Sequence, residues 1–130
     1  MSMKEDIYLE ALYNQLVNIL STESDAQVFA HQPEIQDINT YYVWTEIVNA
    51  RDDYYADALD VDFEIHIVGK SLSRVYELAN LVYDNLNKQQ LTLSTGTNIM
   101  TVLDRRYYAA VRVREEFVIR YIMEGNARVV

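Results

Sequence analysis

The sequence predicts an α+β protein: a two-layer sandwich in which two helices pack on a mostly antiparallel sheet of about four to five strands. Three observations support this prediction. Two segments repeat apolar residues every three or four positions, as amphipathic helices do. Several other segments alternate apolar and polar residues, as half-buried strands do. The chain has 130 residues, so we expect 1–130 to form a single domain.

The first helix is predicted over about Lys4 to Leu20. Ser2 and Glu5 have the spacing of a capping box. The apolar stripe consists of Leu9, Leu12, Leu16 and Ile19. After the helix, residues 28–31 suggest a short strand, and Pro33 with its polar neighbours suggests a loop.

Two strands are predicted in the middle of the chain. Residues 41–48 are rich in aromatic and β-branched side chains. Residues 61–68 alternate, with Val61, Phe63, Ile65 and Ile67 on one side. The connection, residues 49–60, is polar and acidic. The two strands can therefore pair as a hairpin with a long, exposed tip.

The second helix is predicted over Leu72 to Leu86. In the preceding turn, Gly69 is expected to permit a bend and Ser71 to cap the helix. The stripe that faces the sheet consists of Leu72, Val75, Ala79, Val82 and Leu86.

Two further strands are predicted after a turn at Gly96, one over about Ile99 to Arg105 and one over residues 111–124. We expect a bulge near Glu115 in the last strand. One side of that strand carries Val111, Val113, Phe117, Ile119 and Tyr121, and the other carries Arg112, Arg114, Glu116 and Arg120. The charged side is expected to meet water or a partner, and residues 125–130 to be loose or dependent on a contact.

The stretch VDFEIHIVGKSLSR, residues 61–74, resembles half of a phosphate-binding loop, because a strand runs into Gly69, Lys70 and Ser71 ahead of a helix. The full motif needs another glycine five residues before Gly69, where this chain has Glu64. A carboxylate on a strand would repel phosphate. A nucleotide-binding enzyme using Gly69, Lys70 and Ser71 is therefore the less favoured alternative.

The composition disfavours further classes of function. The net charge of −9 disfavours wrapping nucleic acid, because non-specific affinity comes from Lys and Arg that neutralise phosphates. The chain has no cysteine, and His31 and His66 are expected at the surface or its boundary. The sequence contains no motif for a catalytic residue, a cofactor or a metal ion. A structural or binding role is favoured.

Charge is unevenly distributed along the chain. Residues 52–64 carry six acids and no base, whereas residues 105–120 carry five arginines and two glutamates. The acidic run could hold a hard cation, but it lacks the glycine and distal glutamate of a calcium loop, so a solvated acidic face is preferred. Eleven tyrosines include the pair Tyr54-Tyr55; tyrosine suits sheet faces as well as protein interfaces.

The chain resembles the tail terminator proteins of long-tailed bacteriophages, also called tail completion, neck or head-tail joining proteins. The resemblance covers nearly the whole chain. It rests on the opening helix DIYLEALYNQLVNIL, on VFAHQPEI before YYVWTEIV, on VDFEIHIVGKSLSRVYELANLVYDNL, and on TVLDRRYY before REEFVIRYI. These features are diffuse and include no catalytic fingerprint.

The resemblance implies a structural virion protein that is not an enzyme. It implies a homo-oligomeric ring, expected to be a hexamer, that caps the head-proximal end of the tail tube and stops tube polymerisation. The tail tube protein would lie below and a head-completion or connector protein above. DNA would pass through the lumen without specific binding. Such a protein is assembled in the host cytoplasm and resides in the neck of the virion, and no membrane is involved.

A ring needs head-to-tail contacts that close. We therefore expect the acidic loop and the arginine-bearing strand to take part in contacts with neighbours, although a merely solvated arginine face remains open. The candidate interface residues are Asp52, Asp53, Tyr54, Tyr55, Asp57, Asp60, Arg112, Arg114 and Arg120. The alternative from another functional class is a small intracellular adaptor that binds one protein partner through its tyrosine-rich sheet.

Overall fold

The computed structural model describes residues 3–53, 55 and 57–130. Within these residues the elements follow the order α, β, β, β, α, β, β that the sequence predicts. The helices are α1 (Lys4–Ile19) and α2 (Leu72–Leu86). The strands are β1 (Ala26–Phe29), β2 (Tyr41–Asp53), β3 (Ala58–Gly69), β4 (Asn98–Val113) and β5 (Glu116–Val129).

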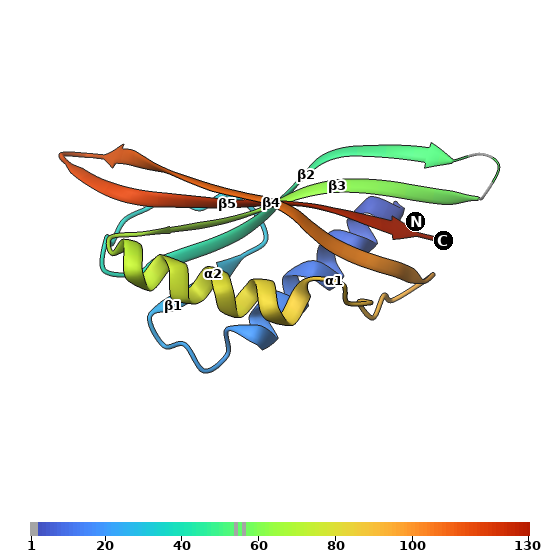
Figure 1. Ribbon diagram of the computed structural model, residues 1–130, viewed down its shortest axis with the longest axis horizontal. Helices are drawn as coiled ribbons and strands as arrows, with labels where there is room; N and C mark the ends of the chain where they lie inside the picture. Colours follow the sequence, from blue (N-terminus) through green and yellow to red (C-terminus); the bar gives the residue numbers. More distant parts are fainter. Residues whose placement is uncertain (1–2, 54, 56) are drawn as a thin grey trace.

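The strands form one sheet in the order β1-β2-β3-β5-β4. The short β1 pairs with β2 in parallel, and the other neighbours are antiparallel. Both helices lie on the same face of this sheet, and the β2–β3 and β4–β5 hairpins point to opposite ends of the molecule (Figure 1). The predicted two-layer α+β architecture is confirmed.

The main core lies between the helices and the sheet. From β3, the alternating Val61, Phe63, Ile65 and Ile67 are all buried there, as predicted. From α1, Tyr8, Leu12 and Leu16 are fully buried. A smaller apolar cluster lies on the opposite face, where segment 30–40 covers one end of the sheet; its buried members are Tyr42, Trp44, Val68 and Val118.

The helix boundaries agree closely with the sequence. α2 has the predicted bounds, and the Ser71 side chain caps it by accepting a hydrogen bond from the Arg74 backbone N–H at 3.4 Å. Leu72 is partly exposed, whereas the rest of the predicted α2 stripe is buried. The N-cap of α1 is Met3, and the predicted cap Ser2 lies outside the described residues.

Gly69 has a different role from the predicted bend. It is the last residue of β3, and its backbone does not occupy the left-handed region. A Cβ at this position would overlap the ring of Tyr41 on β2. Glycine is therefore required by close packing against an aromatic ring, and no loose loop exists here that could surround a phosphate.

The two hairpins are longer than predicted. β2 and β3 stay paired through most of segment 49–60, as far as Asp53 opposite Ala58. The expected bulge near Glu115 is a turn instead: β4 ends at Val113, β5 begins at Glu116, and Arg114 has a positive φ of 59°. The chain therefore reverses where one continuous strand was expected.

The tail prediction was also wrong. Most of segment 125–130 lies in β5, and Ala127 and Val129 are buried in the main core. Strand β5 lies inside the sheet between β3 and β4, so its end is held by hydrogen bonds on both sides.

Candidate functional site

The face of the sheet away from the helices carries a polar cluster around His66. His66 was expected at the surface or its boundary, but only 2% of its side chain is exposed, whereas His31 is exposed as expected. Its ring stacks on the indole of Trp44 on the neighbouring strand, at 4.8 Å between centroids and 4° between planes. The guanidinium of Arg120 on β5 lies 5.5 Å from the Trp44 ring centre.

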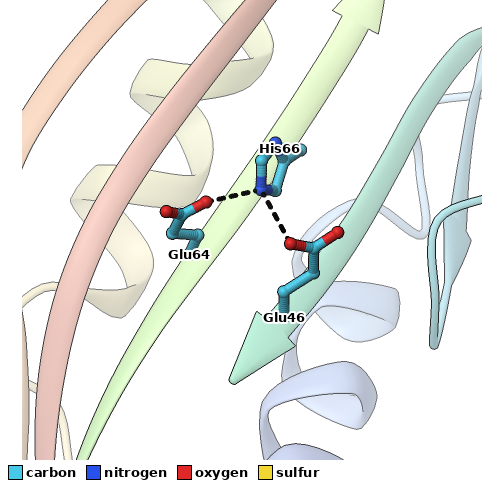
Figure 2. Close-up of side chains that lie close together, drawn as sticks. All are labelled: Glu46, Glu64 and His66. Atoms are coloured by element: carbon cyan, nitrogen blue, oxygen red, sulfur yellow. Dashed lines mark ion pairs between the residues drawn. The ribbon is translucent and has the colours of Figure 1, made fainter. Parts of the chain in front are cut away.

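Two carboxylates approach the same nitrogen of His66 (Figure 2). Nε2 lies 2.9 Å from Oε2 of Glu64 and 3.7 Å from Oε2 of Glu46. The two contacts are ion-pair distances, and Nε2 has no hydrogen-bond partner among the described residues. Glu46 is held in place by the Trp44 indole N–H, which donates to its Oε1 at 3.1 Å.

Arg120 fixes the protonation of the ring. Its Nε donates to Nδ1 of His66 at 3.2 Å, so Nδ1 holds the lone pair and the ring proton is on Nε2, facing the carboxylates. Burial and the positive charge of Arg120 lower the pKa of His66, and the negative charges of Glu46 and Glu64 offset part of that shift. The result is a neutral imidazole between an arginine and two carboxylates.

One imidazole nitrogen and two carboxylates also resemble the ligands of a zinc ion, whose ligand atoms lie about 3.3 Å apart when bonds are about 2.0 Å long. Arg120 opposes metal binding here. A metal needs the lone pair of Nε2, which would move the ring proton to Nδ1 and set it against the N–H groups of the guanidinium. The cluster fits a buried structural network better than a metal centre.

A shallow acidic hollow of about 250 Å³ lies beside this cluster. Two β-bulges flank it: Val48 is the extra residue of β2, and Asp104 is the extra residue of β4. Glu64 lines it, but His66 does not, so the hollow gives no substrate access to the imidazole. The complete lining is Val48, Asp62, Phe63, Glu64, Asp104, Glu124 and Gly125.

The acids predicted for the interface separate into two groups. Asp53 and Asp60 bind Arg128 of the same chain, at 2.8 and 3.3 Å, although Asp53 also has other interactions. Asp52 and Asp57 are exposed near the tip of the β2–β3 hairpin, where Asp57 has a φ of 48°. Asp52 and Asp57 form no ion pair with another described residue, so a neighbour could contact them without breaking one.

Tyr55, one of the two tyrosines predicted for the interface, lies at the tip of the same hairpin. Tyr55 is fully exposed, and its backbone N–H donates to Oδ1 of Asp53 at 3.1 Å. Tyr54 lies outside the described residues. An exposed tyrosine beside exposed acids is compatible with the predicted contact, which stays a prediction.

The predicted arginines do not share one face. Arg112 lies opposite Phe117, on the same side of the sheet as the helices, whereas Arg120 lies on the other side against His66. Arg114 is in the turn, and its carbonyl accepts from Nε of Arg112 at 3.2 Å. The single charged side expected from the sequence does not exist, because the turn after Val113 interrupts the alternation.

Sequence reasoning missed Arg128 and Trp44 as members of charged or polar networks. Arg128 neutralises two of the acids, but it lies in the segment that was expected to be loose. The alternation of Gly125, Ala127 and Val129 with polar residues was the available signal for a strand there. The contacts of Trp44 depend on strand register, which the sequence does not reveal.

The described part of the chain has no helix that is both long and apolar enough to cross a membrane.

Comparisons with known proteins show a fold that this chain shares with a solved structure. No family model matches the chain, and no curated protein matches it. A chain of the solved structure described as "Virion of native gene transfer agent (GTA) particle" superposes with a TM-score of 0.69 at 20% sequence identity. The match covers 99% of this chain and 98% of that chain. The two chains therefore share a fold over their whole lengths.

Proposed function

We propose that this chain is a non-enzymatic structural protein of a phage-like virion and that it acts as a tail terminator. The observation that carries the proposal is the full-length structural likeness to a chain of a gene transfer agent virion. The match covers 99% of this chain and 98% of that chain, so the likeness extends over both helices and the whole sheet. The family resemblance of the sequence supports the more specific role.

In this role, six copies form a ring at the head-proximal end of the tail tube, in the neck of the virion. The ring stops tube polymerisation and contacts the tail tube protein on one side. On its other side it contacts a head-completion or connector protein. Assembly takes place in the host cytoplasm.

The charge of the helix-free sheet face is compatible with a conduit for DNA. Glu46, Glu64 and Glu124 lie in one row across three neighbouring strands, and all three are partly exposed. Carboxylates repel phosphates, so DNA that passes such a surface would not adhere to it. We propose that this face lines the lumen, through which DNA passes without specific binding.

Electron microscopy of the purified protein mixed with tail tubes from the source virus tests the proposal. Rings, or tubes closed at one end by an added layer, are expected. The matched control is a mixture with an unrelated acidic protein of similar size. A protein that leaves both tube ends bare and stays monomeric beside the tubes would refute the terminator role and favour an adaptor.

A further inference from the structure

Part of the outer edge of β4 and part of the outer edge of β2 are open, and these two stretches lie toward opposite ends of the sheet. The outer edge of β4 is open over residues 105–113, and the outer edge of β2 is open over residues 45–52. No backbone partner outside the hairpin is found for either stretch among the described residues. Most of both stretches is exposed, including the whole of segment 104–110. Unpaired N–H and C=O groups on such edges favour pairing with another strand.

The rest of each edge is covered by the chain itself. On β4, Thr101 exchanges backbone hydrogen bonds with segment 88–89 at 2.7 and 2.8 Å, and the Asn87 side chain accepts from the backbone N–H of Leu103 at 2.9 Å. On β2, the four residues of β1 cover Tyr41 to Trp44. The molecule thus covers part of each edge and leaves the rest available.

The two open stretches are complementary in charge. Segment 105–113 contains three arginines and no acid, whereas segment 45–52 contains two acids and one arginine. Their directions are also suitable: β4 is antiparallel to β5, β5 to β3 and β3 to β2, so β4 runs opposite to β2. If sheets of identical copies continue side by side, β4 of one copy meets β2 of the next in antiparallel orientation.

We propose that neighbouring copies of this chain join edge to edge, with segment 105–113 of one copy pairing antiparallel with segment 45–52 of the next. This inference rests on the proposed ring. Trp44, His66, Ile122 and Tyr107 lie in one row across the sheet, so the two open stretches extend from this row in opposite directions. Neighbouring copies are therefore displaced along the strands, as the strands of a closed barrel are staggered. The contact is heterologous and can close into a ring.

Cysteine cross-linking on assembled tail ends tests the pairing, because the natural chain has no cysteine. The double variant Ala50→Cys/Ala109→Cys places one exposed thiol on each open edge. Treated with a short bis-maleimide, it should give a ladder of covalent multimers, and each single variant should stay monomeric. The matched control, Gln27→Cys/Ala109→Cys, tests β1 as the alternative edge and should give no ladder.

Several results would overturn the pairing. Covalent dimers from Ala109→Cys alone would show a two-fold contact between β4 strands, and a ladder only with Gln27→Cys would show that β1 is the partner. Rings that are visible by electron microscopy but give no Ala50–Ala109 ladder would reject the edge contact and leave the terminator role intact. The absence of rings from the natural protein would reject the terminator role itself.

A charge exchange provides a second measurement. Arg105→Glu/Arg112→Glu should lower the yield of cross-linked multimers at least tenfold, because both positions lie on the open edge of β4. Adding Asp52→Arg to the same chain should recover part of that yield. An unchanged urea midpoint would show that the variants fold. Full cross-linking by a folded Arg105→Glu/Arg112→Glu variant would contradict the role of charge in the contact.

Discussion

Gly69→Ala provides a sharp test of how the sheet and the second helix are joined. A Cβ on Gly69 would lie 2.9 Å from Cγ of Tyr41 and closer still to two other atoms of that ring. The ring cannot move freely, because Tyr41 is only 8% exposed and its hydroxyl accepts a hydrogen bond from the Ser71 backbone N–H at 3.2 Å. Ser71 is the N-cap of α2, so displacement of the ring also disturbs the start of that helix.

Overpacking of this kind costs about 1–3 kcal/mol, and loss of one hydrogen bond adds about 1 kcal/mol. We therefore expect Gly69→Ala to lower the free energy of unfolding by about 2–4 kcal/mol. Urea denaturation measures this loss as a lower midpoint with an unchanged slope.

The same substitution made in a Tyr41→Ala background tests the reasoning. Without the ring, alanine can occupy position 69, because the backbone there is not left-handed. It should then be neutral or stabilising by up to about 1 kcal/mol, since it restricts the unfolded chain. An equal loss of stability in both backgrounds, or a loss below about 0.5 kcal/mol in the natural chain, would refute the steric argument.

Three other predictions follow from buried or networked polar groups. Burial and the charge of Arg120 lower the pKa of His66 from 6.5, so as the pH falls the unfolded chain binds a proton before the folded chain does. The free energy of unfolding should therefore fall as the pH drops below about 6.5. This fall should be smaller in His66→Gln. Arg74→Met should lower the free energy of unfolding, measured by urea denaturation, by about 1 kcal/mol, because it removes the bidentate hydrogen bonds to Asp25. Tyr8→Phe should lower the free energy of unfolding, measured in the same way, by about 1 kcal/mol, because the Tyr8 hydroxyl forms a hydrogen bond with Oγ1 of Thr101 at 2.7 Å.

Each of these has a distinct contrary result. An identical pH profile for the natural chain and His66→Gln would show that the histidine does not carry the pH dependence. For Arg74, Lys4→Met is the matched control, because Lys4 forms no ion pair with another described residue; equal effects of the two substitutions would show that the network around Arg74 does not contribute to stability. For Tyr8, no loss on removal of the hydroxyl would mean that Thr101 is satisfied by Asn98 alone, which it already contacts at 3.0 Å.

The candidate interface shows why sequence reasoning reached some features and missed others. The acidic segment and the arginine segment are properties of composition, and both are present at opposite ends of the sheet. Which of their residues are available depends on partners far away in the chain. Asp60 is bound by Arg128, and Arg120 contacts a buried histidine. Such pairs depend on register, and a shift of one residue would exchange the two faces.

The order of the elements, the two-layer class, the bounds of α2 and its serine cap could be predicted from the sequence, because each follows from local periodicity or local hydrogen bonding. The tertiary structure alone decided the turn after Val113, the burial of His66 and the ordered end of β5. Short alternating segments look alike in a bulged strand, a hairpin or a loose tail. Only pairing between distant strands, which buries one face and satisfies the backbone, separates these possibilities.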